Sequence, residues 1–454
     1  MVIGRSRTAA TLGVLVGGAV LAAVACGVES AGPGGTGGVD DPSTGGTSSG
    51  TGGSGMSGGG AAGAGGAATE EPKSCPAGIT IVLSDYSATQ VALSSIEGET
   101  LSASFLSTAS TETAGLAFAL SGDVALPSSP PPSKRIVLLD RFGTNVITWA
   151  DPKTAQVIDQ LPVGTGFESN PQDYLEVGDG KAFVTRYNPN ASPGEEEFDE
   201  GNDVLVIDTE EPAILGRIPL PMAAEIPPRP SRMLRLGDEV VVNLARVAED
   251  WSATGEAELV GLSIADEEVV WRHTLTGNKS CGRPTLSPDG TRLAVACSGA
   301  MNTDGEIEAL AQSALILFDA TERPLQEIDR FSAEDIAGEP IQSRVAFASD
   351  DVVLLVTQTS WDGSTNNRWL AYDLGTGVTT ELLEAPPDDE GKGRGLVFTS
   401  TTCFPGCSDV CLMADGAAGE LQRVRLESDG SLELLTPIRV ENTVGMPPRA
   451  IGLR

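Results

Sequence analysis

The run Val204-Leu205-Val206-Ile207-Asp208-Thr209 shows the unit from which the fold is built. Its four apolar residues, three of them β-branched, predict a buried strand. The aspartate that follows predicts a turn, because a carboxylate there accepts hydrogen bonds from the amides of the turn. A second apolar run, Ile214–Leu220, predicts the next strand. The unit is therefore a strand, an acid, a turn and another strand.

This unit recurs seven times, at successive spacings of 53 to 58 residues. The acids that end its first strand are Glu97, Asp151, Asp208, Asp266, Asp319, Asp373 and Glu427. A second series of acids is interpreted as the tips of the preceding hairpins, and consists of Asp123, Asp179, Asp238, Asp289 and Asp350. Each repeat then holds four antiparallel strands, so the sequence predicts an all-β fold, a seven-bladed β-propeller with four-stranded blades. Two tandem sandwiches are the alternative, and the even spacing argues against them.

The first repeat lacks an innermost strand of its own, and the C-terminal run Arg449–Leu453 is expected to supply it. Closing the ring in this way removes an open sheet edge. Within the fifth repeat, Ser287-Pro288-Asp289-Gly290 resembles the hairpin motif of bacterial Tol-type and surface-layer-type propellers. The resemblance implies a propeller architecture for residues 75–454.

The N-terminus has the pattern of an export signal. Arg5 and Arg7 precede the apolar stretch Thr8–Ala25, and small residues stand just before Cys26. This pattern resembles a bacterial lipoprotein signal, which implies removal of residues 1–25 and lipidation of Cys26. A short transmembrane anchor is the alternative, because about 18 apolar residues can just span a bilayer.

Residues 26–74 consist mainly of Gly, Ser, Thr and Ala. Such a segment cannot bury enough apolar surface to offset its ordering entropy, so we expect a disordered linker that spans roughly 40 Å. The chain is thus predicted to be a monomeric propeller tethered to the bacterial cell envelope. The absence of a retention aspartate after Cys26 favours the outer membrane, on either its periplasmic or its surface side.

Six cysteines follow Cys26, and an even number in an exported protein indicates disulfides. Cys281 and Cys297 are equidistant from the expected hairpin tip at Asp289, so they should face each other and pair. Cys75, Cys403, Cys407 and Cys411 leave three connectivities open. Because Cys75 precedes the first strand, one of the other three is expected to staple the N-terminus. Zinc binding by these cysteines is disfavoured by their spacing.

The charge balance excludes several partners. Lys+Arg is 29 and Asp+Glu is 63, which gives a net charge of −34 and argues against nucleic acid and anionic membrane surfaces. Contact with a membrane is expected through the lipid alone. The chain has one histidine, His273, which lies in the apolar run Val269–Leu275 and is interpreted as structural. No catalytic residue is assigned.

No cofactor or metal is expected. The acidic run Glu195–Asp203 could hold Ca²⁺ through carboxylate oxygens, but it lacks the alternation of an EF-hand loop, and a solvated surface loop is favoured.

The longest loops are predicted to join the second and third strands of their blades, on one face of the ring. They are Pro127–Lys134, Tyr187–Asp203, Arg246–Glu258, Ser298–Ser313 and Ser360–Arg368. Long loops on a rigid scaffold commonly carry binding surfaces. Tyr187, Trp251 and Trp361 are therefore candidate anchors for a partner, unless they cap the loops themselves.

Arginines recur near the expected starts of the innermost strands. Arg232, Arg283 and Arg344 each lie six residues before a hairpin acid. Arg394 and Arg449 stand at the expected starts of the two remaining inner strands. These residues are predicted to surround one mouth of the central channel and to bind a carboxylate or another anion. In the alternative, each arginine pairs with a neighbouring acid, such as Asp173, and locks adjacent blades.

These observations favour a non-enzymatic binding protein that recognises a protein, peptide or glycan of the cell envelope. The alternative is a propeller enzyme of the lactonase or lyase type, which would work through Asp, Arg and Tyr.

Overall fold

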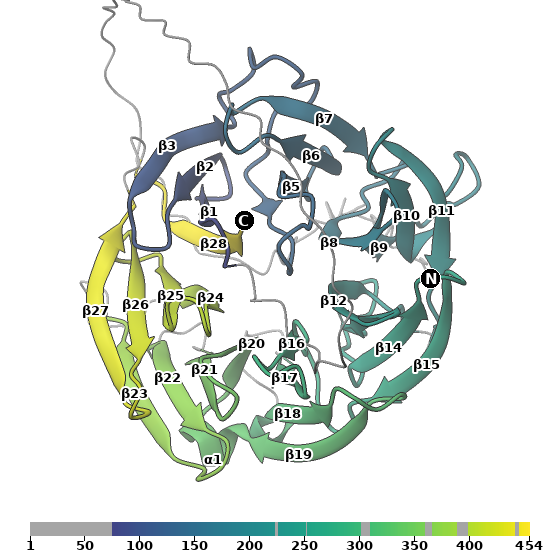
Figure 1. Ribbon diagram of the computed structural model, residues 1–454. Helices are drawn as coiled ribbons and strands as arrows, with labels where there is room; N and C mark the ends of the chain where they lie inside the picture. The colour runs from purple at the N-terminus through teal and green to yellow at the C-terminus, as the bar shows by residue number, and fades with distance from the viewer. Residues whose placement is uncertain are drawn as a thin grey trace, which may run out of the picture.

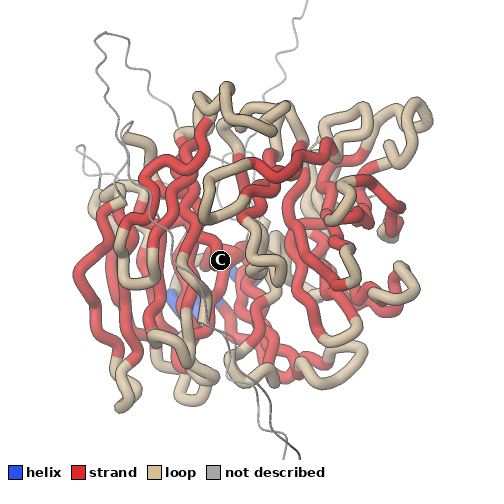
Figure 2. Tube along the Cα trace, turned by 45° about the horizontal axis from the view of Figure 1, so that its top comes forward, coloured by secondary structure: helices blue, strands red, loops and turns tan. Residues whose placement is uncertain are grey.

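The computed structural model describes residues 75–222, 226–250, 252–300, 309–358, 366–387, 398–440 and 445–454. These residues form seven four-stranded antiparallel sheets arranged as blades in a ring, as the sequence predicts (Figure 1). In each blade the first strand is innermost and the fourth lies at the rim. Figure 2 shows the strands running between two faces of the ring, with loops on both.

Blade 1 contains strands from both ends of the described chain. From the inside outwards its strands are β28 (Pro448–Leu453), β1 (Ile79–Ser84), β2 (Thr89–Ser94) and β3 (Thr100–Ser107). β28 pairs antiparallel with β1, with Ile451 opposite Ile81. The closure expected from the sequence is confirmed, and it leaves no gap between the first and last blades (Figure 1).

The other blades follow the chain in order. Blade 2 contains β4 (Val124–Ala125), β5 (Ile136–Asp140), β6 (Val146–Ala150) and β7 (Val157–Pro162). Blade 3 contains β8 (Pro171–Gly178), β9 (Lys181–Pro189), β10 (Gly201–Asp208) and β11 (Ala213–Pro219). Blade 4 contains β12 (Pro230–Leu236), β13 (Glu239–Leu244), β14 (Glu258–Ser263) and β15 (Glu268–Thr274).

Blade 5 contains β16 (Thr285–Leu286), β17 (Arg292–Ser298), β18 (Ser313–Asp319) and β19 (Gln326–Ser332). Blade 6 contains β20 (Ile341–Phe347), β21 (Val352–Thr357), β22 (Arg368–Asp373) and β23 (Thr379–Glu384). Blade 7 contains β24 (Phe398–Cys403), β25 (Val410–Asp415), β26 (Glu420–Leu426) and β27 (Leu432–Arg439). A 3₁₀ turn, η1 (Leu310–Gln312), and a short helix, α1 (Ala333–Ala337), lie in blades 5 and 6. In the described part of the chain, no helix has the length and apolar character needed to span a bilayer.

Apolar side chains fill the space between blades. Seven clusters of buried residues each join one blade to the next, and one of them joins blade 7 to blade 1. The second and third strands are buried on both faces because they lie between two neighbouring blades, as the unbroken burial of β5 and β6 shows. The fourth strands have one exposed side. The mixed pattern of β11 is typical of this outer position.

Blade 2 departs from the expected hairpin pattern. Asp123 is not a hairpin tip: it immediately precedes β4, and Val124 of that strand pairs with Asp140. The connection between β4 and β5 is the ten-residue segment 126–135, which therefore joins the first and second strands. The prediction that Pro127–Lys134 joins the second and third strands is wrong, because the aspartate register does not hold in this blade. The other four long loops do join second and third strands.

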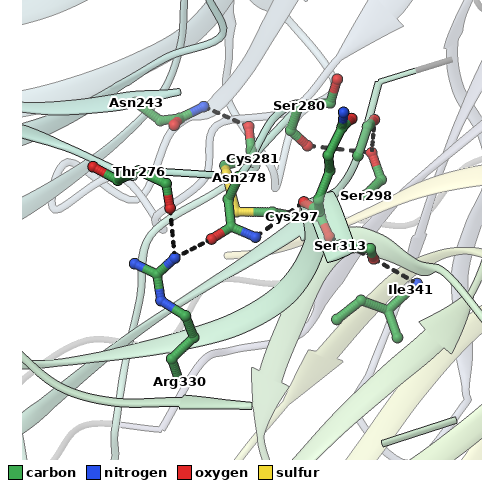
Figure 3. The surroundings of a disulfide bond; sticks show 12 residues. Asn243, Thr276, Asn278, Ser280, Cys281, Cys297, Ser298, Ser313, Arg330 and Ile341 are labelled. Atoms are coloured by element: carbon green, nitrogen blue, oxygen red, sulfur yellow. Dashed lines mark hydrogen bonds between the residues drawn. A yellow bond between two sulfur atoms is a disulfide. The ribbon is translucent and has the colours of Figure 1, made fainter. Parts of the chain in front are cut away.

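Three disulfides staple the ring. Cys281 pairs with Cys297, its antiparallel partner across the hairpin, as expected. Cys75 pairs with Cys407, so blade 7 holds the residues ahead of β1, and Cys403 pairs with Cys411. Figure 3 shows the first bridge next to Asn243, whose side-chain amide donates a 2.6 Å hydrogen bond to the carbonyl of Cys281. The bridge therefore lies where blade 5 contacts blade 4.

Candidate functional site

The inner strands bring several arginines to one end of the channel. Arg232, Arg344 and Arg449 stand near the starts of β12, β20 and β28, and Arg283 stands two residues before β16. The starts of inner strands lie on the same face as the connections between second and third strands. We call these four residues, together with Arg141, the arginine mouth. Arg394, the remaining predicted member, falls outside the described residues.

Arg141 was not found by counting back from the hairpin acids to the starts of the inner strands, because it lies in the turn after the second strand of its blade. Its Nε donates to Asp123 Oδ1 at 3.1 Å, and its Nη2 donates to the same oxygen. Its Nη1 donates to Gln172 Oε1 at 3.1 Å. The sequence pattern predicts Asp123 at a hairpin tip, at the opposite end of its blade, so only the fold reveals this ion pair at the mouth.

Asp173 is the buried acid of the site. It is fully buried, and its carboxylate accepts hydrogen bonds from the amides of Ser128 at 2.8 Å and Met233 at 2.7 Å. Arg232 Nη1 lies 4.0 Å from Asp173 Oδ1 and donates to the carbonyl of Leu126 at 3.2 Å. Burial raises the pKa of the Asp173 carboxyl, while the charge of Arg232 opposes that rise. Asp173 thus balances one arginine and fixes the segment 126–135 to blades 3 and 4.

Arg283 and Arg344 are not in contact with an acid. Among the described residues, the guanidinium of Arg283 makes no hydrogen bond or ion pair, and that of Arg344 donates to the carbonyl of Thr399. Desolvation lowers the pKa of Arg344 to about 10, with further lowering by the like charges of Arg232 and Arg141. Desolvation also lowers the pKa of Arg283; the charge of Asp173 opposes this change and that of Arg232 adds to it. The guanidinium groups therefore act on one another at this mouth.

Arg449 lies next to the aromatic ring of Tyr86. Its guanidinium carbon is 5.4 Å from the centre of the Tyr86 ring, and its Nε donates to the carbonyl of Ser84 at 3.2 Å. Tyr86 belongs to the turn between β1 and β2. The cation–π contact holds Arg449 against blade 1.

A cavity of about 170 Å³ lies in the channel beside Arg283. Four apolar side chains of inner strands line it: Leu234, Leu286, Ile451 and Leu453. The segment 127–130 forms another part of its wall, and the hydroxyl oxygen of Ser128 is buried there without a hydrogen-bond partner among the described residues. The cavity thus combines one cation with four apolar side chains and with polar wall residues such as Thr402.

Of the three aromatic residues proposed as anchors, the structure describes Tyr187. The Tyr187 ring lies 5.1 Å from the guanidinium carbon of Arg229, and burial raises the pKa of Tyr187 to about 12. Tyr187 therefore contributes to the packing of its own loop. Trp251 and Trp361 lie outside the described residues.

Two carboxylates of the acidic run Glu195–Asp203 are engaged by other groups of the protein. Asp199 accepts hydrogen bonds from the amides of Gly194, Glu195 and Glu196, and Asp203 pairs with Arg186. The three amide contacts lower the pKa of Asp199. Over the described ranges, no group of three or more His, Cys, Asp or Glu side chains is arranged to hold a metal ion.

His273 lies on the fourth strand of blade 4, away from the arginine mouth. Its ring meets that of Phe318 edge to face, with 5.2 Å between the ring centres, and desolvation lowers its pKa. These contacts agree with a structural role.

Known proteins resemble this chain in fold. No protein-family model matches the sequence, and no curated protein matches it. Hydrazine synthase from Kuenenia stuttgartiensis has a TM-score of 0.51 at 13% identity, covering 79% of this chain and 98% of that one. A periplasmic gluconolactonase from Pseudomonas aeruginosa has a TM-score of 0.50 at 13% identity, covering 82% and 98%. A hypothetical selenium-binding protein from Sulfolobus tokodaii has a TM-score of 0.52 at 10% identity, covering 84% and 94%. At these identities the likeness shows the propeller fold alone.

Proposed function

We propose that this protein is a non-enzymatic binding protein that holds an anionic group of its ligand at the arginine mouth. The ligand classes are a protein or peptide carboxylate and an acidic sugar. The observation that carries the proposal is Arg283, whose guanidinium has no hydrogen-bond or ion-pair partner among the described residues although Arg232 places a like charge near it.

The electrostatics support an anion at this place. Four arginines of the mouth are Arg141, Arg232, Arg283 and Arg344, whereas the acids that contact them in the described structure are Asp123 and Asp173. An anion between Arg283 and Arg344 would relieve the repulsion and form charge-assisted hydrogen bonds. Because the whole chain carries a net charge of −34, such a local excess of positive charge favours one specific anion over nonspecific anion binding.

We further propose that the propeller is exported and held at the bacterial envelope by a lipid on Cys26, through the linker 26–74. Three disulfides support an oxidising compartment. Incorporation of labelled palmitate into the wild-type protein, lost in Cys26→Ala, is the expected result. Equal labelling of both proteins would contradict the lipid anchor.

Binding measurements test the proposed site. Isothermal titration of the purified protein with free-carboxylate peptides and acidic sugars should detect binding that Arg283→Ala weakens about 10- to 100-fold, since one hydrogen bond to a charged group contributes about 1.5–3 kcal/mol. Arg425→Ala is the matched control, because it removes the same charge from β26, where the nearest acids are 3.9 Å and 4.0 Å away. Equal weakening by both substitutions, or no binding of any anion, would contradict the proposal.

The lactonase alternative makes a different prediction for the same ligands. The two acids of the described mouth are already engaged, Asp123 by Arg141 and Asp173 by backbone amides. A general base would need a less occupied carboxylate. Hydrolysis of sugar lactones by the purified protein, abolished by Asp173→Asn, would establish the enzyme instead of the binder.

A further inference from the structure

The cavity next to Arg283 restricts what the anion is attached to. Its volume of about 170 Å³ is comparable with engineered protein cavities of about 150 Å³ that accept benzene. A group of about six non-hydrogen atoms therefore fits inside. The cavity lies deeper in the channel than Arg283, because its other wall residues belong to later positions of the inner strands, such as Leu286 and Leu453.

The charge and the apolar part of the cavity wall favour one chemistry. Arg283 supplies one guanidinium, which matches the two oxygens of a single carboxylate. Leu234, Leu286, Ile451 and Leu453 supply apolar surface beyond it. Hydroxyl groups of a sugar acid would be costly against these four side chains, because buried polar groups without partners lose their hydrogen bonds to water. Ser129 and Thr402 also line the cavity, so the apolar surface covers one part of the wall. An apolar tail gains free energy on the same walls.

We propose that the cavity binds a carboxylate that carries a short apolar tail, with the carboxylate on Arg283 and the tail between Leu234, Leu286, Ile451 and Leu453. This inference rests on the proposed function of the arginine mouth and names its ligand class. Two sources supply this chemistry: a free short-chain monocarboxylic acid, and the C-terminal apolar residue of a polypeptide.

A chain-length series tests the tail. Titration of the purified protein with the linear acids from acetate to octanoate should show about threefold to fourfold tighter binding per methylene, because each buried methylene contributes about 0.8 kcal/mol. The gain should stop near hexanoate, where the tail fills the cavity. Arg283→Ala should weaken every member of the series by a similar factor.

A variant that fills the cavity distinguishes the contribution of the apolar tail to binding from that of the carboxylate. Ser129 lies on the segment 127–130 at the cavity wall, so Ser129→Phe should abolish the dependence on chain length and leave acetate binding unchanged. Ser192→Phe is the matched control, since Ser192 is exposed on the loop between β9 and β10. Leu286→Ala enlarges the cavity and should move the plateau to longer acids.

Each outcome identifies which statement fails. If acetate and hexanoate bind equally and both depend on Arg283, the tail site is overturned and the proposed function stands. If no carboxylate binds, the proposed function is overturned as well. Gly-Gly-Leu and its C-terminal amide distinguish the sources: tight binding of the free peptide alone indicates a polypeptide C-terminus, and preference for hexanoate over the peptide indicates a free acid.

Discussion

Arginines on the same face of the ring differ in how their charges are balanced. Arg186 is fully buried, and its Nε and Nη2 donate to the two carboxylate oxygens of Asp203 at 2.8 Å and 2.6 Å. Its remaining donors reach Thr165 and the carbonyl of Phe198. Arg283, by contrast, lines a cavity and makes no hydrogen bond or ion pair among the described residues.

The difference follows from strand pairing. Arg186 and Asp203 are partners in the register of β9 and β10, so the fold places the acid directly opposite the arginine. Such a pair braces the long loop between these strands. Arg283 precedes a strand of two residues, and the charges that act on it, Asp173 and Arg232, belong to other blades. An arginine balanced by its own blade supports the fold, and we propose that an arginine without an acid in contact, such as Arg283, binds the ligand.

The largest expected effect concerns Arg449, which belongs both to the arginine mouth and to the strand that closes the ring. Deleting Arg449–Arg454 removes most of β28 and leaves β1 without its inner neighbour. We expect loss of cooperative unfolding and of the disulfide-bonded native state, measured by circular dichroism and thermal melting. Arg449→Ala keeps the strand and should shift the melting temperature far less. An unchanged melting curve for the deletion would contradict the role of β28 in closure.

Asp203→Asn tests the balanced arginine directly. Removing one partner of a buried ion pair leaves an uncompensated charge, which costs about 3–5 kcal/mol of the free energy of unfolding. Arg283→Ala should change that free energy by less than about 0.5 kcal/mol, because it removes a partly exposed group without a partner in the described structure. Urea unfolding measures both. Equal destabilisation by the two substitutions would show that Arg283 is structural.

The repeat predicted the fold because each strand is specified locally. Runs such as Val204–Ile207 and the acid after them encode a strand and a turn within a few residues, and blade closure follows from counting strands. Blade 2 broke the pattern because ten residues join its first and second strands, so Asp123 falls at the start of β4 instead of at a hairpin tip. The segment 126–135 therefore belongs to the first connection of its blade instead of the second.

The site was less predictable, for a physical reason. Arg232, Arg283 and Arg344 followed from counting along inner strands, but the ion pair of Arg141 with Asp123 depends on contacts between residues with no shared periodicity. The cavity next to Arg283 depends on how the segment 127–130 crosses the channel. For Tyr187 the sequence left open a partner anchor or a cap on its own loop, and the contact of its ring with Arg229 agrees with the cap. Contacts between side chains of different blades follow no period along the chain, so a single sequence does not predict them.

Arg186 is held in place by an ion pair, whereas the backbone next to Arg283 is held by a disulfide. Cys281 and Cys297 are 16 residues apart, so replacing both with alanine should lower the free energy of unfolding by about 3 kcal/mol. The same double variant should weaken carboxylate binding, since β16 has only two paired residues to hold Arg283 in place. Replacing Cys75 and Cys407 is the control, because neither residue lines the cavity, and it should leave binding unchanged. Loss of binding in the control alone would contradict this link.

The smallest expected effect lies at the other end of the same hairpin, where an acid is balanced mainly by hydroxyl and amide donors. The Ser287 hydroxyl donates to Asp289 Oδ1 at 2.5 Å and the amide of Thr291 donates to the same oxygen at 3.0 Å, which lowers the pKa of Asp289 to about 2. The ordinary value is 3.8, so the ionised carboxylate stabilises the folded state. That contribution is complete above about pH 4 and is lost as the pH falls towards 2. Because Asp289 is exposed, solvent screening keeps the effect small.

The melting temperatures of wild type and Asp289→Asn, measured between pH 5 and pH 2, test this contribution. The two melting temperatures should converge as the pH falls. A constant difference across that range would contradict the stabilising role of the carboxylate.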